Sequence, residues 1–202
     1  MRIITANVNG IRAAEKKGFF DWMKRQRADV ICLQETKAQE HQLDPTDFYP
    51  KGYHSYFFDA VKKGYSGVAL YCKHQPDAVR TGLGWEHCDT EGRWIEADFG
   101  KLTVVSLYLP SGSSNEERHA NKLVFMDKLR AEMKKMRRRH REYVITGDFN
   151  TVHKRIDIKN FMSNRRNSGC TDEERQWMDD VLNKDGWVDA FRVVETGPDQ
   201  YT

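Results

Sequence analysis

Short apolar runs recur along the chain, and most of them are followed by polar or glycine-containing turns. Runs of this length, bounded in this way, are typical of β-strands. One of them, Val-Ile-Cys-Leu at 30–33, has no polar position and is interpreted as a buried strand. We expect strands at Arg2–Ala6, Asp29–Leu33, Tyr53–Phe58, Val68–Tyr71, Ala78–Thr81, Trp94–Phe99, Leu102–Leu107 and Tyr143–Ile145.

Other segments place apolar residues at helical spacing. Residues Ala13–Arg27 predict one amphipathic helix whose inward residues are Phe19, Phe20, Trp22 and Met23. A capping box, Ser114 with Glu117, predicts the start of a long helix that ends near Arg139. Its buried face is expected to carry Met126, Leu129, Met133 and Met136.

A second capping box, Thr171 with Glu174, predicts another helix. Its inward residues are expected to be Trp177, Met178, Val181 and Leu182. Strand-like and helix-like segments alternate, and we find no internal repeat or low-complexity linker. The pattern predicts a single α/β domain over residues 1–202, with helices covering sheets.

Composition narrows the class of protein only moderately. The chain has 202 residues, 39% of them hydrophobic, and a net charge of +3, which neither requires nor excludes nucleic acid. We see no signal peptide and no apolar run of membrane-spanning length. The four cysteines lack zinc-site spacing, so we expect reduced thiols and a cytoplasmic protein.

Polar side chains follow several of the predicted strands. Acidic and amide residues at strand ends, without His or Cys ligands, suit a hard cation such as Mg²⁺. The residues in question are Asn7, Asn9, Glu35, Tyr108, Asp148 and Asn150. Each alone has a simpler explanation, because a strand-end Asp is commonly a turn residue and Tyr108 suits a core aromatic. Glu35 alone could pair with Lys37 or Arg12. The functional interpretation therefore depends on all of these strand-end residues lying close together at one edge.

Several motifs carry a family resemblance, and they occur in the same order over essentially the whole chain. They are Asn7–Ala13 (NVNGIRA), Leu33–Lys37 (LQETK), Gly64–Leu70 (GYSGVAL), Glu91–Arg93 (EGR) and Gly147–Asn150 (GDFN). Together they resemble the exonuclease III family of apurinic/apyrimidinic (AP) endonucleases, within the endonuclease/exonuclease/phosphatase superfamily. The resemblance implies a four-layer α/β sandwich, in which two packed mixed β-sheets are flanked by helices.

The resemblance also implies roles for the strand-end residues. Glu35, with Asn7 and Asp148, would bind Mg²⁺, for which Mn²⁺ could substitute. Asp148 would activate the attacking water, Asn150 would orient it or hold the phosphate, and Tyr108 would contact the scissile phosphate. The implied chemistry is metal-dependent phosphodiester hydrolysis, with endonuclease and 3′–5′ exonuclease activity in base-excision repair.

The implied partner is duplex DNA with abasic sites or 3′ ends, bound by a monomer without membrane association. DNA contacts would come from Arg12, Lys37, Tyr65, Arg93, Asn160, Asn164, Arg165 and Asn167. A separate basic cluster, Lys134–Arg141, is interpreted as a solvated helix end.

The chain departs from the family pattern at its end. The family continues into a strand with an Asp and a Ser-Asp-His segment, whereas this sequence stops at Thr202, so we expect a C-terminally incomplete domain lacking its last strands. A phosphoesterase of phospholipids or inositol phosphates remains a rival, although the basic, Asn-rich loop after GDFN argues against it. A second rival is a non-catalytic RNA- and protein-binding regulator that resembles the catabolite repression control protein.

Overall fold

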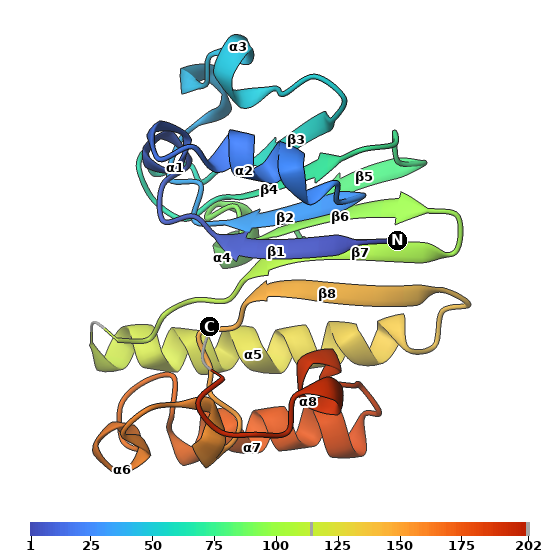
Figure 1. Cartoon of the computed structure of the whole chain (residues 1–202). Coiled ribbons are helices and arrows are strands. Elements are labelled where there is room, and N and C mark those ends of the chain that lie inside the picture. The colour runs from blue at the N-terminus through green and yellow to red at the C-terminus, as the bar shows by residue number, and fades with distance from the viewer. Residues whose placement is uncertain (114, 201–202) are drawn as a thin grey trace. The chain divides into compact units, whose positions relative to one another are not determined.

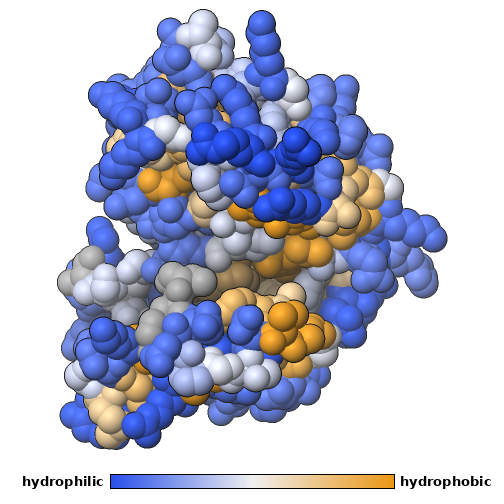
Figure 2. Space-filling view, in the orientation of Figure 1, coloured by the Kyte–Doolittle hydropathy of each residue, from blue (hydrophilic) through white to orange (hydrophobic). Residues whose placement is uncertain are grey.

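The computed structural model describes residues 1–113 and 115–200, and the chain forms two compact units. Unit 1 consists of Met1–Leu109 and Arg139–Phe149, and unit 2 of Pro110–Arg138 and Asn150–Thr202. The predicted single domain over residues 1–202 stays a prediction. Within the described ranges, no helix has the length and apolar character needed to cross a bilayer. Hydrophilic residues cover most of the face that Figure 2 shows.

Unit 1 contains two four-stranded mixed sheets (Figure 1). In each sheet one pair of strands is parallel, β1 with β2 and β7 with β8, and the other pairs are antiparallel. The first sheet has the order β1 (Ile3–Asn7), β2 (Val30–Gln34), β4 (Val68–Cys72) and β3 (His54–Phe58). The second has the order β5 (Ala78–Thr81), β6 (Trp94–Phe99), β7 (Leu102–Tyr108) and β8 (Glu142–Asp148). All eight predicted strands are therefore confirmed, and β8 extends further than expected in both directions.

The two sheets pack face to face around a shared apolar core. Successive side chains of a strand point to opposite faces, so Val30 and Cys32 of β2 enter the inter-sheet core. They meet Ile95 of β6 and Val104 of β7 there. Because the core joins both sheets, the predicted arrangement of two packed mixed sheets is confirmed.

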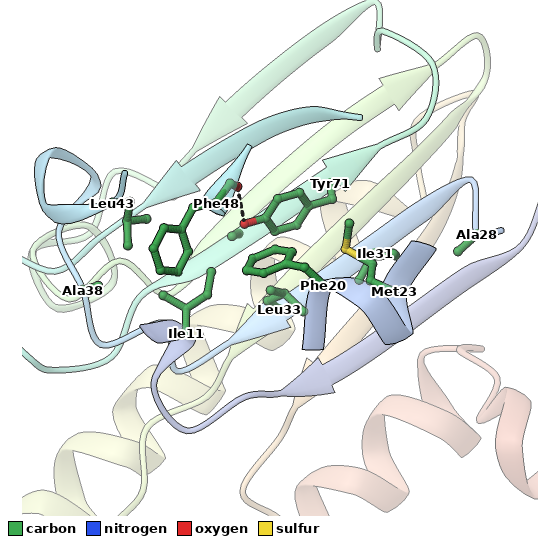
Figure 3. Close-up of a cluster of buried hydrophobic side chains, with 11 residues drawn as sticks. Ile11, Phe20, Met23, Ala28, Ile31, Leu33, Ala38, Leu43, Phe48 and Tyr71 are labelled. Atoms are coloured by element: carbon green, nitrogen blue, oxygen red, sulfur yellow. Dashed lines mark hydrogen bonds between the residues drawn. The ribbon is translucent and has the colours of Figure 1, made fainter. Parts of the chain in front are cut away.

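The alternate residues of the first sheet face helices. Ile31 and Leu33 of β2 pack with Phe20 and Met23 in a second cluster, which Figure 3 shows. Tyr71 belongs to the same cluster, and its hydroxyl donates a hydrogen bond of 3.0 Å to the carbonyl of Phe48 (Figure 3). Burial on both faces explains why the strand at 30–33 has no polar position.

The predicted helix Ala13–Arg27 is wrong in its bounds, because the structure has two helices, α1 (Ile11–Lys16) and α2 (Phe19–Gln26). Gly18 separates them with a φ of 83°, a left-handed conformation that cannot continue a helix. The inward face also differs from expectation, since Trp22 is 37% exposed. The remaining short helices of unit 1 are η1 (Glu40–Gln42), α3 (Pro45–Phe48) and α4 (Glu86–Asp89).

Unit 2 is helical in its described part. Its main helix, α5 (Glu116–Met136), buries the expected face, with Met126, Leu129, Met133 and Met136. It ends three residues before the expected position, and its N-cap is Asn115, which accepts a hydrogen bond from the amide of Arg118. The predicted cap residue, Ser114, lies outside the described residues.

The second predicted capping box is confirmed at the start of α7 (Asp172–Asp179), where Thr171 and Glu174 cap each other. Trp177 packs against α5, and its indole N–H donates to the carbonyl of Met126 at 2.7 Å. Val181 is buried as expected, whereas Met178 and Leu182 are only partly buried. The other elements of unit 2 are η2 (Arg155–Asp157), α6 (Phe161–Asn164), the π-helical turn η3 (Asp180–Lys184) and α8 (Ala190–Val194). The four cysteines are buried free thiols, as expected.

Candidate active site

Asn7 lies at the end of β1 and contacts two carboxylates at once. Its Nδ2 lies 2.7 Å from Oε1 of Glu35 and 2.9 Å from Oδ2 of Asp148. Its Oδ1 accepts a hydrogen bond of 3.0 Å from the amide of Asn9, and this bond orients the side-chain amide. The three residues predicted to bind the metal therefore lie together. Asn7 presents its N–H groups to the carboxylates, which makes it a positioning residue in this arrangement.

Glu35 follows β2 and is held by a lysine as well. Its Oε2 lies 2.6 Å from Nζ of Lys37, which also donates to Oδ1 of Asn9 at 2.5 Å. Partial burial raises the pKa of Glu35, but the hydrogen bonds from Lys37 and Asn7 outweigh it, so the pKa lies below its usual value. The carboxylate is therefore held in its charged form.

The backbone around Glu35 adopts unusual conformations. Asn9, Glu35 and Lys37 have φ values of 45°, 55° and 48°, in the left-handed region that costs roughly 1–2 kcal/mol for a residue with a side chain. Hydrogen bonds hold the strained loop, since the amide of Gly10 donates to the carbonyl of Glu35 at 2.7 Å and the amide of Lys37 donates to the carbonyl of Ser66 at 2.9 Å. Strain of this kind persists only where the surroundings enforce it, and it is common at functional sites.

Glycines allow the close approaches that this edge requires. A Cβ on Gly67 would lie 2.2 Å from Oγ1 of Thr36, so the loop after Glu35 depends on a glycine at that position. A Cβ on Gly147 would lie 1.9 Å from the carbonyl oxygen of Leu107, on the neighbouring strand. Asp148 follows Gly147, and its carbonyl accepts the amide of Leu109 at 2.9 Å. The conformation at Gly147 and Asp148 is therefore set by the packing of β8 against β7.

Tyr108 ends β7, and its hydroxyl interacts with the carboxylate of Glu35. Burial and the negative charge of Glu35 raise the pKa of Tyr108, so its hydroxyl remains a proton donor at neutral pH. Arg93 lies over the ring of Tyr108, with 4.9 Å between the guanidinium carbon and the ring centroid, and donates to the hydroxyl of Tyr65 at 3.0 Å. Tyr65, Arg93 and Tyr108 therefore form one cluster.

Arg93, one of the residues predicted to contact DNA, has a buried side chain with three partners in this cluster. Arg93 is 1% exposed, and its guanidinium donates to Glu91 at 2.6 Å and to the carbonyl of Tyr108 at 3.0 Å. Arg93 therefore contacts both tyrosines, and its contact with DNA stays a prediction. Arg12 is exposed on α1, and Lys37 is half-buried against Glu35.

Gln34 links the two sheets beside the site, a role that the sequence did not reveal. Its Nε2 donates to Oγ of Ser106 at 2.9 Å, and this hydroxyl donates to the carbonyl of Leu33 at 2.9 Å. Both polar side chains are buried, so their hydrogen bonds fix the ends of β2 and β7 relative to each other.

The other predicted residues belong to unit 2. Asn150 has a φ of 46°, and its carbonyl accepts a hydrogen bond of 2.5 Å from Nζ of Lys122. Asn164 donates to the carbonyl of Asn160 at 3.2 Å, and Asn167 donates to Oδ1 of Asn164 at 3.1 Å. These contacts order the loop itself, and Arg165 is exposed beside them. DNA contact by the four loop residues stays a prediction.

Lys122 and Glu174 form a buried ion pair in unit 2 that we did not predict. The Nζ of Lys122 lies 2.5 Å from Oε1 of Glu174, and both side chains are 0% exposed. Glu174 also accepts the backbone amides of Gly169 and Thr171. A signal was present in the sequence, because Lys122 occupies the same helical stripe as Phe125 and Met126.

The donor set suits a hard divalent cation. One carboxylate oxygen of Glu35 and one of Asp148 lie within hydrogen-bond distance of Nδ2 of Asn7. In proteins, Mg²⁺ typically binds one or two carboxylates together with water and phosphate. Within the described ranges, no group of three or more His, Cys, Asp or Glu side chains could hold a metal ion. The residues therefore fit a site in which the protein supplies only part of the coordination.

Two packed mixed sheets with an acidic site at their strand ends place the chain in the α/β-sandwich class. The sequence model of the Endonuclease/Exonuclease/phosphatase family matches residues 4–200, and the chain belongs to this family. The predicted family, whose name joins nucleases and phosphatases, is thereby confirmed.

Named relatives support the same assignment. The chain is 39% identical over 195 residues to an exodeoxyribonuclease of Bacillus subtilis (strain 168), covering 96% of this chain and 75% of the relative. It is 39% identical over 203 residues to the DNA repair nuclease APEX1 of Danio rerio, covering 99% of this chain and 64% of the relative. An AP endonuclease structure from Archaeoglobus fulgidus is similar with a TM-score of 0.82 and 29% identity, over 96% of this chain and 74% of that chain.

Proposed function

We propose that this protein is a Mg²⁺-dependent nuclease that hydrolyses phosphodiester bonds in duplex DNA, at abasic sites and at 3′ ends. The observation that carries the proposal is the Asn7 amide held between the carboxylates of Glu35 and Asp148. The names of the relatives, an exodeoxyribonuclease and a DNA repair nuclease, support the same substrate class.

The chain's own residues have separate tasks in this reaction. Asp148, oriented by Asn7, accepts a proton from the water molecule whose oxygen attacks phosphorus. The bond between phosphorus and the 3′ oxygen breaks, and the 3′ oxygen takes up a proton from solvent. Tyr108 donates a hydrogen bond to a phosphate oxygen as negative charge develops there. Its raised pKa keeps the phenol protonated for this role.

Glu35 and Asp148 would hold the metal ion. A bound Mg²⁺ supplies positive charge that stabilises the developing charge on the phosphate oxygens. Lys37, which pairs with Glu35, keeps the carboxylate ionised, because it contributes to the lowered pKa of Glu35.

A duplex with one abasic-site analogue tests the proposal. We expect a nick 5′ to the lesion with Mg²⁺ and none with EDTA. Glu35→Gln and Asp148→Asn should each lower kcat/KM at least about 100-fold, which corresponds to about 2.7 kcal/mol of barrier. Glu132→Gln, a change on α5 in unit 2, is the matched control. The same assay should compare this chain with a form extended to the length of the relatives. If both forms bind RNA and neither cleaves the duplex, the result would favour the non-catalytic RNA-binding regulator.

A further inference from the structure

Two polar side chains, Gln34 and Ser106, lie in the apolar core between the two sheets of unit 1. Gln34 ends β2 on the same face of the strand as Val30 and Cys32, because side chains two positions apart share a face. Ser106 of β7 likewise shares a face with Val104. Gln34 is 1% exposed and Ser106 is 0% exposed, so both are withdrawn from water. We call this pair the cross-sheet link.

The hydroxyl group of Ser106 makes two hydrogen bonds that cross from one sheet to the other. It accepts from Nε2 of Gln34 at 2.9 Å and donates to the carbonyl of Leu33 at 2.9 Å. The other end of the Gln34 carboxamide is held on β1, where Oε1 accepts a hydrogen bond of 3.2 Å from the hydroxyl of Thr5. Directional bonds therefore tie β1, β2 and β7 together at one level.

Each of these three strands leads into a residue of the candidate site one or two positions after its bonded side chain. The pairs are Thr5 with Asn7, Gln34 with Glu35, and Ser106 with Tyr108. Because a strand rises about 3.3 Å per residue, each site residue lies within roughly 7 Å of the bonded side chain along its own strand. A shift of one sheet against the other at the cross-sheet link would therefore also move the site residues.

The contact between Glu35 and Tyr108 depends on how the two sheets are aligned. Glu35 follows β2 in the first sheet, Tyr108 ends β7 in the second, and the carboxylate interacts with the phenol hydroxyl. The attraction between apolar side chains is non-directional, so it does not fix this alignment by itself. The buried amide and hydroxyl of the cross-sheet link do fix it, because another alignment would leave them without hydrogen-bond partners.

We propose that Gln34 and Ser106 are positioning residues, which hold the Glu35 carboxylate and the Tyr108 hydroxyl at the separation that phosphodiester hydrolysis requires. The assignment rests on the proposed nuclease function, in which Tyr108 contacts the phosphate and Glu35 holds the metal ion. Glu35 has a φ of 55°, and a left-handed residue of this kind keeps its conformation only where its surroundings enforce it. Gln34 supplies such a restraint directly before Glu35, because it is anchored to the opposite sheet.

Steady-state kinetics of Gln34→Met test the proposal on a duplex with one abasic-site analogue and Mg²⁺. Methionine has a similar length, so the core stays filled while the hydrogen bond to Ser106 is lost. We expect kcat to fall about 10-fold, or about 1.4 kcal/mol, with little change in KM. Circular dichroism confirms folding. If Gln34→Met does not fold, Ser106→Ala takes its place with the same expectation, because it removes only one oxygen atom.

Val104→Ala is the matched control, because it removes apolar atoms from the same core and leaves the cross-sheet link intact. Its kcat should stay close to that of the wild type at a temperature where both variants are folded. A kcat that falls as far in Val104→Ala as in Gln34→Met overturns the proposal, since a loosened core would then explain both losses.

A double-mutant cycle with Tyr108→Phe shows whether Gln34 acts through the phenol hydroxyl. Tyr108→Phe removes this hydroxyl and keeps the ring. If Gln34 positions the hydroxyl relative to Glu35, Gln34→Met should cost much less in kcat once the hydroxyl is absent, so the two losses should not add. Fully additive losses overturn the proposal.

The ¹³C chemical shift of Tyr108 Cζ in the metal-free protein reports the hydrogen bond of the phenol independently of catalysis, and Tyr108→Phe assigns the signal. We expect Gln34→Met to move the signal and Val104→Ala to leave it in place. An unmoved signal in Gln34→Met, with an active wild-type enzyme, contradicts the positioning role alone. A moved signal, with a wild type that never cuts the abasic duplex, contradicts the nuclease function alone.

Discussion

The ammonium group of Lys122 lies 2.5 Å from the carboxylate of Glu174, and neither side chain reaches solvent. The same ammonium donates to the carbonyl of Asn150. Burial raises the pKa of Glu174, but the hydrogen bond and charge of Lys122 outweigh it, so the pKa is lowered. The pair therefore joins α5, the start of α7 and Asn150, which all belong to unit 2.

Replacing one partner of this pair should be costly. Lys122→Met leaves the carboxylate of Glu174 buried without its cation, so we expect a loss of about 3–5 kcal/mol in the free energy of unfolding. Urea denaturation at pH 7 measures this loss. The double variant Lys122→Met/Glu174→Gln should recover part of it, because the uncompensated charge is gone. A single variant within about 0.5 kcal/mol of wild type would show that the charges are not buried in solution.

Gly147→Ala should destabilise unit 1. The added Cβ would lie 1.9 Å from the carbonyl oxygen of Leu107, which forces β8 away from β7. We expect a loss of at least about 2 kcal/mol in urea denaturation. Gly100→Ala is the matched control, since Gly100 also has a positive φ but its Cβ would meet nothing within 4 Å. Equal losses for the two variants would mean that backbone conformation, and not the close approach, sets the requirement for glycine.

Asn7→Ala should separate catalysis from folding. The change removes the donor between Glu35 and Asp148, and we expect kcat to fall about 100-fold, or about 2.7 kcal/mol, with little change in KM. Steady-state kinetics on the abasic duplex with Mg²⁺ measure both constants. Asn121→Ala, an exposed amide on α5, is the control and should behave as wild type. An Asn7→Ala variant with full kcat would exclude a positioning role for Asn7.

The ionisation of Glu35 should depend on Lys37. Folding lowers the pKa of Glu35 below its usual value of 4.5, so its carboxylate stabilises the folded state above that pH. This contribution is lost as the pH falls through the lowered pKa of the folded protein. Lys37→Met removes a donor and a positive charge while the burial remains, so the pKa should rise. An NMR titration of the Glu35 carboxyl carbon gives the midpoint, and an unchanged midpoint would contradict the assignment of Lys37.

The strands were predictable because an alternating or continuous apolar pattern reports burial directly. Val30 and Cys32 face one core while Ile31 and Leu33 face the other, and the sequence shows this as an unbroken apolar run. The break between α1 and α2 was missed, because the helical spacing of apolar residues continues across Gly18. Only the positive φ of Gly18 shows that the helix stops.

The sequence predicted which residues form the candidate site, but it did not predict which atoms they contact. Strand-end position and motif resemblance brought Asn7, Glu35 and Asp148 together, and the structure confirms that they meet. The burial of Arg93 and of Lys122 depends on partners that are distant in sequence, so local pattern could not reveal it. A charged residue on an apolar helical stripe, as at Lys122, is nevertheless a signal that can be sought.

The strand order has a consequence for how the site forms. Within residues 1–113 and 115–200, β1 and β8 are the outer strands of two different sheets, and the hydrogen bond from Asn7 to Asp148 joins their ends across 141 positions of sequence. A contact between such distant residues must offset the entropy of closing the long loop between them, so topologies with many such contacts fold slowly. The site therefore exists only where the ends of β1 and β8 have come together, and a chain in which they have not would carry the two carboxylates apart. Catalytic competence in this protein reports that both sheets have assembled.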